Sequence, residues 1–106
     1  MMNCSRNDVV LLPIPFTDLS SSKVRPAIVV GHGNFSGDLF VVPVTSQAAN
    51  SDFMLGGWRA AGLNVASGVK SQRATVEDSL VRKIIGKLTA TDVALLDEHL
   101  KAWCQL

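Results

Sequence analysis

The amino-acid sequence predicts a small, mainly β domain: a strongly bent antiparallel barrel with one helix packed at its C-terminal end. Two observations predict this class. Short apolar runs rich in β-branched residues follow one another closely up to Gly86, separated by glycine, proline and serine. The final stretch instead repeats apolar residues at helical spacing. With 106 residues, 47% of them hydrophobic, the chain is sized for a single domain, 1–106, with one core.

The first half of the chain holds three apolar runs that predict strands: Asp8–Ile14, Val24–Val30 and Asp38–Thr45. Pro13 and Pro15 cannot donate backbone hydrogen bonds. The first strand is therefore expected at a sheet edge, or bent at its prolines. The segment 17–23 is a polar loop, and the glycines of segment 31–34 predict the turn that ends the second strand.

The second half predicts shorter elements. The segment 50–63 contains two adjacent glycines and is ambiguous, with room for a short strand and a helical turn. Ser67–Val76 alternates well enough for one strand, and Leu80–Gly86 for another.

The C-terminal segment is expected to form an amphipathic helix. Thr89, followed three residues later by Asp92, is an acidic variant of the capping box that begins helices. Four apolar residues then recur at helical spacing: Val93, Leu96, Leu100 and Trp103. Polar residues lie off that stripe, among them Asp92, Asp97, Glu98 and Lys101. His99 lies beside the stripe and is expected to be a partly buried packing residue.

Charge and composition restrict the function classes. The net charge is only +1, which argues against a generally basic protein that coats nucleic acid. Residues 59–87, however, carry six basic side chains against two acidic ones, enough to build one basic face. No apolar run approaches the roughly 20 residues of a membrane span, and the N-terminus lacks the apolar core of a signal peptide. A cytoplasmic location without membrane attachment is expected.

Metal and cofactor chemistry is not indicated. His32 and His99 have no partners at metal-ligand spacing, and the turn 31–34 is too short for a nucleotide-binding loop. Ser20–Ser22 have no nucleophile-elbow context. Cys4 and Cys104 are expected to be reduced thiols, although a disulfide between the two termini is the alternative.

Five segments occur in an order and spacing that resemble the MazF/PemK family of bacterial toxins: DVVLLPIPFTDLSSSKVRPAIVV, VVPVTS, GWRAAGL, SGVK with its later threonine, and LVRKIIGKLTATD. The similarity extends from about Asp8 to the C-terminus. It implies a small SH3-like barrel, a homodimer, and neutralisation by a cognate antitoxin protein. It also implies metal-independent, sequence-selective cleavage of single-stranded RNA, the activity of an mRNA interferase.

The resemblance also implies the site. Arg25 of RPA matches the family's catalytic arginine, and Thr45 of VPVTS its catalytic threonine. The loop Thr17–Lys23 falls where these toxins use a mobile loop beside the RNA groove. Substrate-binding roles are therefore expected for Ser46, Thr17, Asp18, Ser21, Lys23 and Lys70.

These side chains suit the chemistry of RNA cleavage without a metal. The guanidinium of Arg25 is a planar fork of donors that fits two phosphate oxygens, and Thr45 can add a hydroxyl donor. Arginine is a poor general base because its pKa lies above about 12. Asp18 and His32 are candidates for the base by pKa range alone, and the base stays unassigned.

The sequence departs from the family pattern at three places. Asn7 stands where many relatives have glycine, and Ala66-Ser67 where many have Pro-Ser. Well-studied branches carry a QIRT-like motif that supplies a second arginine to the site, whereas here Arg73 precedes Thr75 by two positions. In a strand, that shift points the side chain to the opposite face, so the role is not transferred to Arg73.

Two alternatives to the nuclease remain open. One is a toxin of the same fold that poisons a protein target such as gyrase through an apolar, tryptophan-containing C-terminus, which the ending KAWCQL resembles loosely. The other is a catalytically inactive relative that binds RNA or protein, which the altered stretch before Thr75 keeps open.

Overall fold

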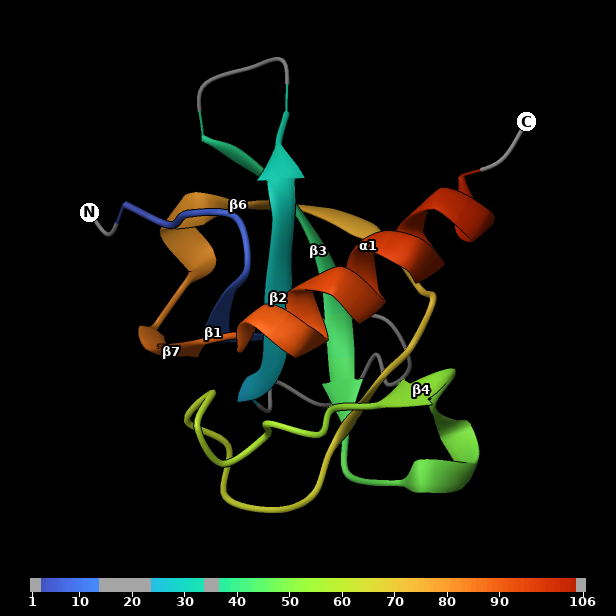
Figure 1. The fold of residues 1–106 in the computed structure, drawn as a ribbon. Helices are drawn as coiled ribbons and strands as arrows, with labels where there is room; N and C mark the ends of the chain where they lie inside the picture. Colours follow the sequence, from blue (N-terminus) through green and yellow to red (C-terminus); the bar gives the residue numbers. More distant parts are fainter. Residues whose placement is uncertain (1–2, 14–23, 34–36, 105–106) are drawn as a thin grey trace.

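The computed structural model, which describes residues 3–13, 24–33 and 37–104, confirms a mainly β fold with one C-terminal helix (Figure 1). The strands are β1 (Asp8–Pro13), β2 (Val24–His32), β3 (Asp38–Thr45), β4 (Phe53–Met54), β5 (Gly68–Val69), β6 (Ala74–Glu77) and β7 (Lys83–Lys87). The helix is α1 (Ala90–Trp103), and two 3-10 turns are η1 (Ala48–Asn50) and η2 (Asp78–Leu80). No helix in these ranges is long and apolar enough to cross a membrane.

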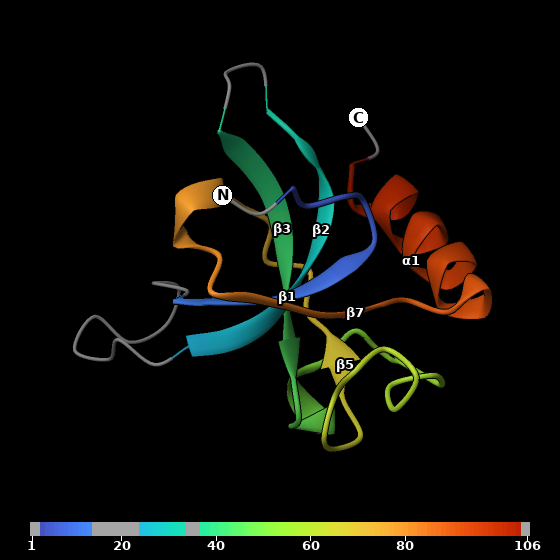
Figure 2. The same ribbon diagram turned by 90° about the vertical axis from the view of Figure 1, so that its left-hand side faces the viewer.

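The strands form one antiparallel sheet of seven strands, in the order β4-β5-β3-β2-β1-β7, with β6 also paired to β3. Strand β3 is the centre of this arrangement. One of its edges pairs with β2, while the other pairs with β6 at Asp38–Val41 and with β5 at Val44–Thr45. Strands β5 and β6 pair with different parts of the same edge of β3, and the sheet is strongly bent (Figure 2).

Strand β1 is not at a sheet edge, contrary to the expectation from its prolines. It pairs with β2 on one side and β7 on the other, and Val10 lies opposite both Ala27 and Ile84. Pro13 is the last residue of the strand, where its missing backbone donor breaks no ladder inside the sheet. The irregularity lies at Val9–Val10, where the register with β7 shifts. Pro15 lies outside the described residues.

The single strand predicted over Ser67–Val76 is wrong, because the structure has two strands there. After β5 the backbone N–H of Lys70 donates to the carbonyl of Pro43 at 3.1 Å. The N–H of Ser71 donates to the carboxylate of Asp52 at 2.8 Å. These bonds divert the chain before it rejoins β3 as β6. The strand predicted over Leu80–Gly86 also begins later than expected. The 3-10 turn η2 extends to Leu80, and β7 begins at Lys83.

The central strands are buried on both faces, which explains why they are continuous apolar runs. Alternate residues of β1, β2 and β3 enter two different clusters. The first cluster contains Val10, Leu12, Ala27, Val29, Leu39 and Val41, closed by Cys4, Val76 and Val81. The second contains Val9, Ile28, Val42 and Val44, covered by α1 and by apolar residues of segment 53–63.

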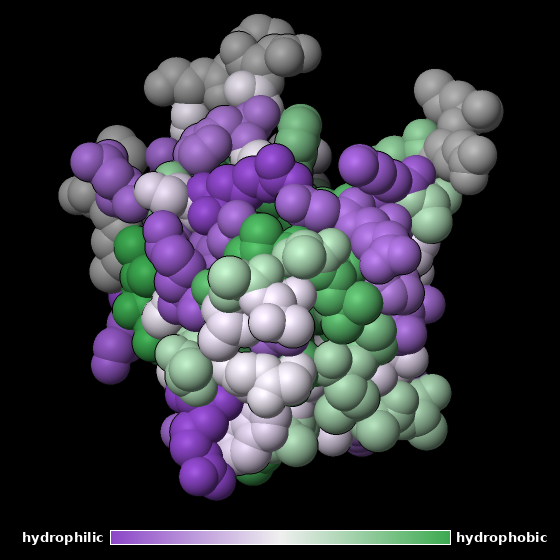
Figure 3. Space-filling view, viewed as in Figure 1, coloured by the Kyte–Doolittle hydropathy of each residue, from purple (hydrophilic) through white to green (hydrophobic). Residues whose placement is uncertain are grey.

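The predicted helical stripe is confirmed, since Val93, Leu96, Leu100 and Trp103 all pack in the second cluster. The His99 ring stacks on Phe53 with 4.3 Å between ring centroids, as expected for a packing residue. A glycine- and alanine-rich segment of the chain runs beneath the start of α1 (Figure 1). In the space-filling view from the same side, pale residues of intermediate hydropathy cover much of the lower part of the face (Figure 3).

Asp92 lies off the apolar stripe of the helix, where a polar side chain normally faces solvent, but the structure buries it. The hydroxyl of Thr89 accepts from the backbone N–H of Asp92 at 3.3 Å, which confirms Thr89 as the helix cap. The Asp92 carboxylate, however, is only 2% exposed and accepts the backbone N–H groups of Gly56 at 3.1 Å and Gly57 at 2.8 Å. Asp92 therefore fastens the helix to the segment that leaves β4.

Asp92→Asn is expected to destabilise the fold, because an amide can accept from only one of the two glycines and turns its own donors toward the other. Leaving a buried donor without a partner costs about 1–3 kcal/mol. The thermal midpoint should fall by roughly 4–8 °C per kcal/mol. Asp97→Asn is the matched control, because its ion pair with Arg6 is exposed and worth under about 1 kcal/mol. Equal midpoints for the two variants, measured by circular dichroism, would contradict this role of Asp92.

The two cysteines are free and lie in different environments, Cys4 buried and Cys104 exposed. Burial, together with the negative charges of Asp8 and Asp78, raises the pKa of the Cys4 thiol. Since the thiolate is the reactive species, iodoacetamide at pH 8 should label Cys104 and leave Cys4 unlabelled until denaturant is added. Mass spectrometry of the native protein is expected to show one adduct. Labelling of both thiols at equal rates would show that Cys4 is not enclosed.

Candidate functional site

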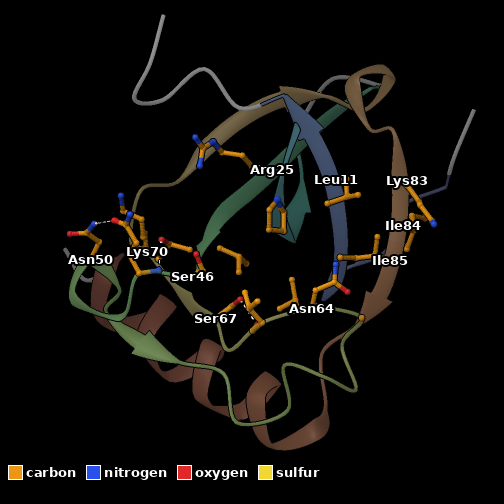
Figure 4. A pocket seen from close by; sticks show the side chains of 17 residues that line it. Leu11, Arg25, Ser46, Asn50, Asn64, Ser67, Lys70, Lys83, Ile84 and Ile85 are labelled. Atoms are coloured by element: carbon orange, nitrogen blue, oxygen red, sulfur yellow. Dashed lines mark hydrogen bonds between the residues drawn. The ribbon is translucent and has the colours of Figure 1, made fainter. Parts of the chain in front are cut away.

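A pocket of about 860 Å³ opens between the start of β2, the end of β3, the start of β7 and the segment 62–67 (Figure 4). Its lining includes apolar residues, among them Leu11, Pro26, Val44 and Ile85. The polar and charged residues of the lining are Arg25, Thr45, Ser46, Gln47, Asn50, Asn64, Ser67, Lys70 and Lys83. The described lining therefore combines apolar and polar surface.

Arg25 and Thr45 reach the same pocket from two different strands. The pairing of β2 with β3 ends at Ala27 and Pro43, two residues short of Arg25 and Thr45. Beyond that point Arg25 pairs with Leu12 of β1, and Thr45 pairs with Gly68 of β5. Both residues line the pocket, and Arg25 is exposed.

The hydroxyl of Thr45 is oriented by the turn that follows it. The backbone N–H of Gln47 donates to the Thr45 Oγ1 at 3.1 Å, so the hydroxyl hydrogen can be donated elsewhere. The Asn50 side-chain amide in turn donates to the side-chain carbonyl of Gln47. Pairing of Thr45 with Gly68 of β5 fixes the backbone from the other side. Thr45 is thus a held donor in the pocket that Arg25 also lines.

The electrostatics of the pocket favour an anion. Three cationic side chains, Arg25, Lys70 and Lys83, belong to the lining, and none of its described residues is acidic. Side chains of one sign around a concave surface concentrate the field in the pocket. A phosphodiester chain is the kind of anion that such a lining suits, because several separate cations can each contact a different phosphate.

The structure brings together four of the predicted site residues: Arg25, Thr45, Ser46 and Lys70. The other four, Thr17, Asp18, Ser21 and Lys23, lie outside the described residues.

His32 does not lie at the pocket. It is seven residues from Arg25 along β2, about 23 Å for an extended strand, and its Nε2 is 3.0 Å from the carbonyl oxygen of Cys4. This position removes His32 as a general base for chemistry at Arg25.

Arg73 lies at a second, smaller hollow of about 640 Å³, between β3, β6 and the end of α1. Its Nη1 donates to the Sγ of Cys104 at 2.8 Å. Arg73 is not among the residues that line the pocket with Arg25. Arg73 precedes β6, which begins at Ala74, and its side chain is directed to the second hollow.

Lys83 and Asn64 belong to the pocket but are not predicted from the sequence. The sequence around Lys83 predicts only a strand, and the pairing of Lys83 with Leu11 of β1 sets its position. Asn64 lies in an irregular segment with no motif. Within the part of the chain that the structure describes, no group of three His, Cys, Asp or Glu side chains could hold a metal ion.

Comparison with known proteins agrees with this description. The family described as PemK-like, MazF-like toxin of type II toxin-antitoxin system matches residues 5–104. The fold is similar to the Mycobacterium tuberculosis toxin MazF-mt6, with a TM-score of 0.71 and 19% sequence identity, over 93% of this chain and 97% of that one. No curated protein sequence matches. The family match spans nearly the whole chain, and the chain therefore belongs to the PemK-like, MazF-like toxins of type II toxin–antitoxin systems.

Proposed function

We propose that this toxin is a metal-independent endoribonuclease that cleaves single-stranded RNA at a short recognition sequence. The observation that carries the proposal is that Arg25 and Thr45 line the same pocket, whose described lining has three cations and no acid. The family supports the same activity, because the sequence motifs that contain these two residues match its catalytic positions.

The proposed reaction uses the ribose 2'-hydroxyl next to the scissile phosphate. Its oxygen attacks phosphorus, the bond from phosphorus to the 5'-oxygen breaks, and the products are a 2',3'-cyclic phosphate and a free 5'-hydroxyl. Arg25 stabilises the negative charge that grows on the non-bridging oxygens, and Thr45 donates its hydroxyl hydrogen to the same oxygens. A preorganised donor of this kind is worth about 3 kcal/mol of the barrier.

Two protons must also move. The 2'-hydroxyl loses one to a general base, and the leaving 5'-oxygen gains one, for which the Arg25 guanidinium is a possible donor. The described lining contains no His, Asp or Glu. Asp18, the other candidate from the sequence, lies outside the described residues, and the base stays unassigned.

Membership of the family implies an antitoxin partner. We further propose a homodimer in the cytoplasm, in which the antitoxin occupies the groove of the dimer. The mass from sedimentation equilibrium tests the dimer.

The packing of Trp103 favours the nuclease over a toxin that poisons a protein target through its C-terminus. Trp103 lies 5.6 Å from the His99 ring and 6.3 Å from the Phe53 ring, between centroids, and packs on the second cluster. A residue used in this way stabilises the helix and is not available as a projecting anchor.

The purified toxin is expected to cut a mixed RNA pool in the presence of EDTA, with sequence preference around the cut. Sequencing of both fragment ends, with chemical typing of the 3' end, should find 2',3'-cyclic phosphates. Intact RNA after prolonged incubation would favour the inactive relative. A requirement for Mg²⁺ would exclude the proposed mechanism.

A further inference from the structure

The pocket has two chemically different halves. Arg25, Ser46, Asn50 and Lys70 lie on one side (Figure 4). The opposite side is formed by the aliphatic side chains of Leu11 and Ile85, with two polar groups beside them, Asn64 and Lys83. Figure 4 shows the Arg25 and Lys83 side chains extending to opposite sides of the pocket. The two cations therefore suit different phosphates.

Asn64 is held on a rigid wall. Just before it, Gly62 has a φ of +92° and packs so closely on β7 that an added Cβ would lie 2.1 Å from the carbonyl oxygen of Ile85. The Gly62 N–H donates to the carbonyl of Arg59, and the Leu63 N–H to that of Trp58, each at 3.1 Å. These contacts fix the backbone from which the Asn64 side chain projects.

A nucleobase matches this half of the pocket in shape and polarity. Its flat faces are apolar enough to lie on aliphatic side chains, and its edges carry hydrogen-bond donors and acceptors side by side. The carboxamide of Asn64 also presents one donor and one acceptor side by side, which is the pattern used to read base edges. Bases of single-stranded RNA are unpaired, so these edges are free to be read.

We propose that Asn64 reads one base of the RNA, seated on Leu11 and Ile85, while Lys83 holds the phosphate on the far side of that base. This inference rests on the proposed nuclease function and names the residue that sets selectivity at one position of the recognition sequence. Asn64 is a specificity-determining residue, and Lys83 is a positioning residue.

The test compares base frequencies around the cut site in a random RNA pool for the wild type and three variants. Asn64→Ala should lose discrimination at one position, by roughly tenfold or more, and keep the preference at the others. Asn64→Asp should turn preference at that same position toward guanine, because a carboxylate accepts from both of its adjacent N–H groups. Gln72→Ala is the matched control: Gln72 is exposed and outside the pocket lining, so its pattern should equal that of the wild type.

Lys83 is tested by the salt dependence of binding to a 2'-O-methyl RNA, which lacks the attacking hydroxyl. Lys83→Ala should reduce the slope of log affinity against log salt concentration by about 0.7, as expected for one lost contact to single-stranded RNA. Arg82→Ala, exposed but outside the lining, should leave the slope unchanged.

An unchanged base pattern for Asn64→Ala, or an unchanged slope for Lys83→Ala, would overturn the subsite even if cleavage by the wild type is confirmed. If the wild type cuts no RNA, the proposed function fails separately. Base frequencies in RNA selected from a random 2'-O-methyl pool then decide the subsite by the same criteria. Thermal midpoints near that of the wild type show that the variants are folded.

Discussion

Arg25→Ala is expected to abolish detectable RNA cleavage while leaving the thermal midpoint nearly unchanged. Arg25 is an exposed residue of the pocket lining, so its loss opens no cavity in either apolar cluster. The expected loss in rate is about 100- to 1,000-fold, the range found when one preorganised donor to a developing oxyanion is removed. Initial rates on a defined RNA oligonucleotide, measured beside melting curves, provide the test.

Three further variants separate the role of Arg25 from charge in general. Arg25→Lys keeps the charge but loses the two-pronged geometry, and should stay strongly impaired. Thr45→Val removes the Thr45 hydroxyl at similar volume and should slow cleavage without changing the fragment ends. Arg59→Ala removes an exposed arginine that lies over the Trp58 ring, outside the pocket lining, and should cut normally. Cleavage by Arg25→Ala at the wild-type rate would show that the assignment is wrong.

Gly62→Ala is expected to produce the largest loss of stability among single-methyl additions to the segment 56–62. The new Cβ would meet a backbone oxygen of β7, which cannot move without breaking the pairing of β7 with β1. The positive φ adds strain for any residue other than glycine. Together these effects amount to about 3 kcal/mol or more, which corresponds to a fall in thermal midpoint above roughly 10 °C.

Gly56→Ala is the matched control for this variant. It adds the same methyl group in the same connection, but the nearest atom, the Asp92 Oδ1, would be 3.9 Å away. Its midpoint should stay within a few degrees of the wild type. Equal thermal midpoints for the two variants would show that the close approach of Gly62 to β7 does not contribute to stability.

The elements that are local in sequence could be predicted. The helix follows from its cap and its apolar spacing, and Asp38–Thr45 from one uninterrupted apolar run. Asn7, which stands where many relatives have glycine, has a φ of 75°, a value that glycine and asparagine adopt readily. The break between β5 and β6 could not be predicted, since it depends on hydrogen bonds to Pro43 and Asp52, which are distant in the sequence.

The candidate site shows the same division. Arg25, Thr45, Ser46 and Lys70 stand in motifs, and the sequence places them at strand ends or next to one. Asn64 and Lys83 have no motif, and only the meeting of segment 62–67 with β7 brings them to the pocket. The buried role of Asp92 was missed for a related reason: a polar residue off the apolar stripe is normally solvated, and its partners are backbone groups that no sequence pattern shows.

The pocket takes its last wall from β7, and β7 is synthesised after every other strand. A growing polypeptide that has not reached Lys83 already carries Arg25 and Thr45 but has nothing to close the site around a substrate. Under the proposed function, a nascent or prematurely terminated chain that lacks β7 is expected to cleave no RNA. The antitoxin would then need to be bound only by the time that the fold is complete.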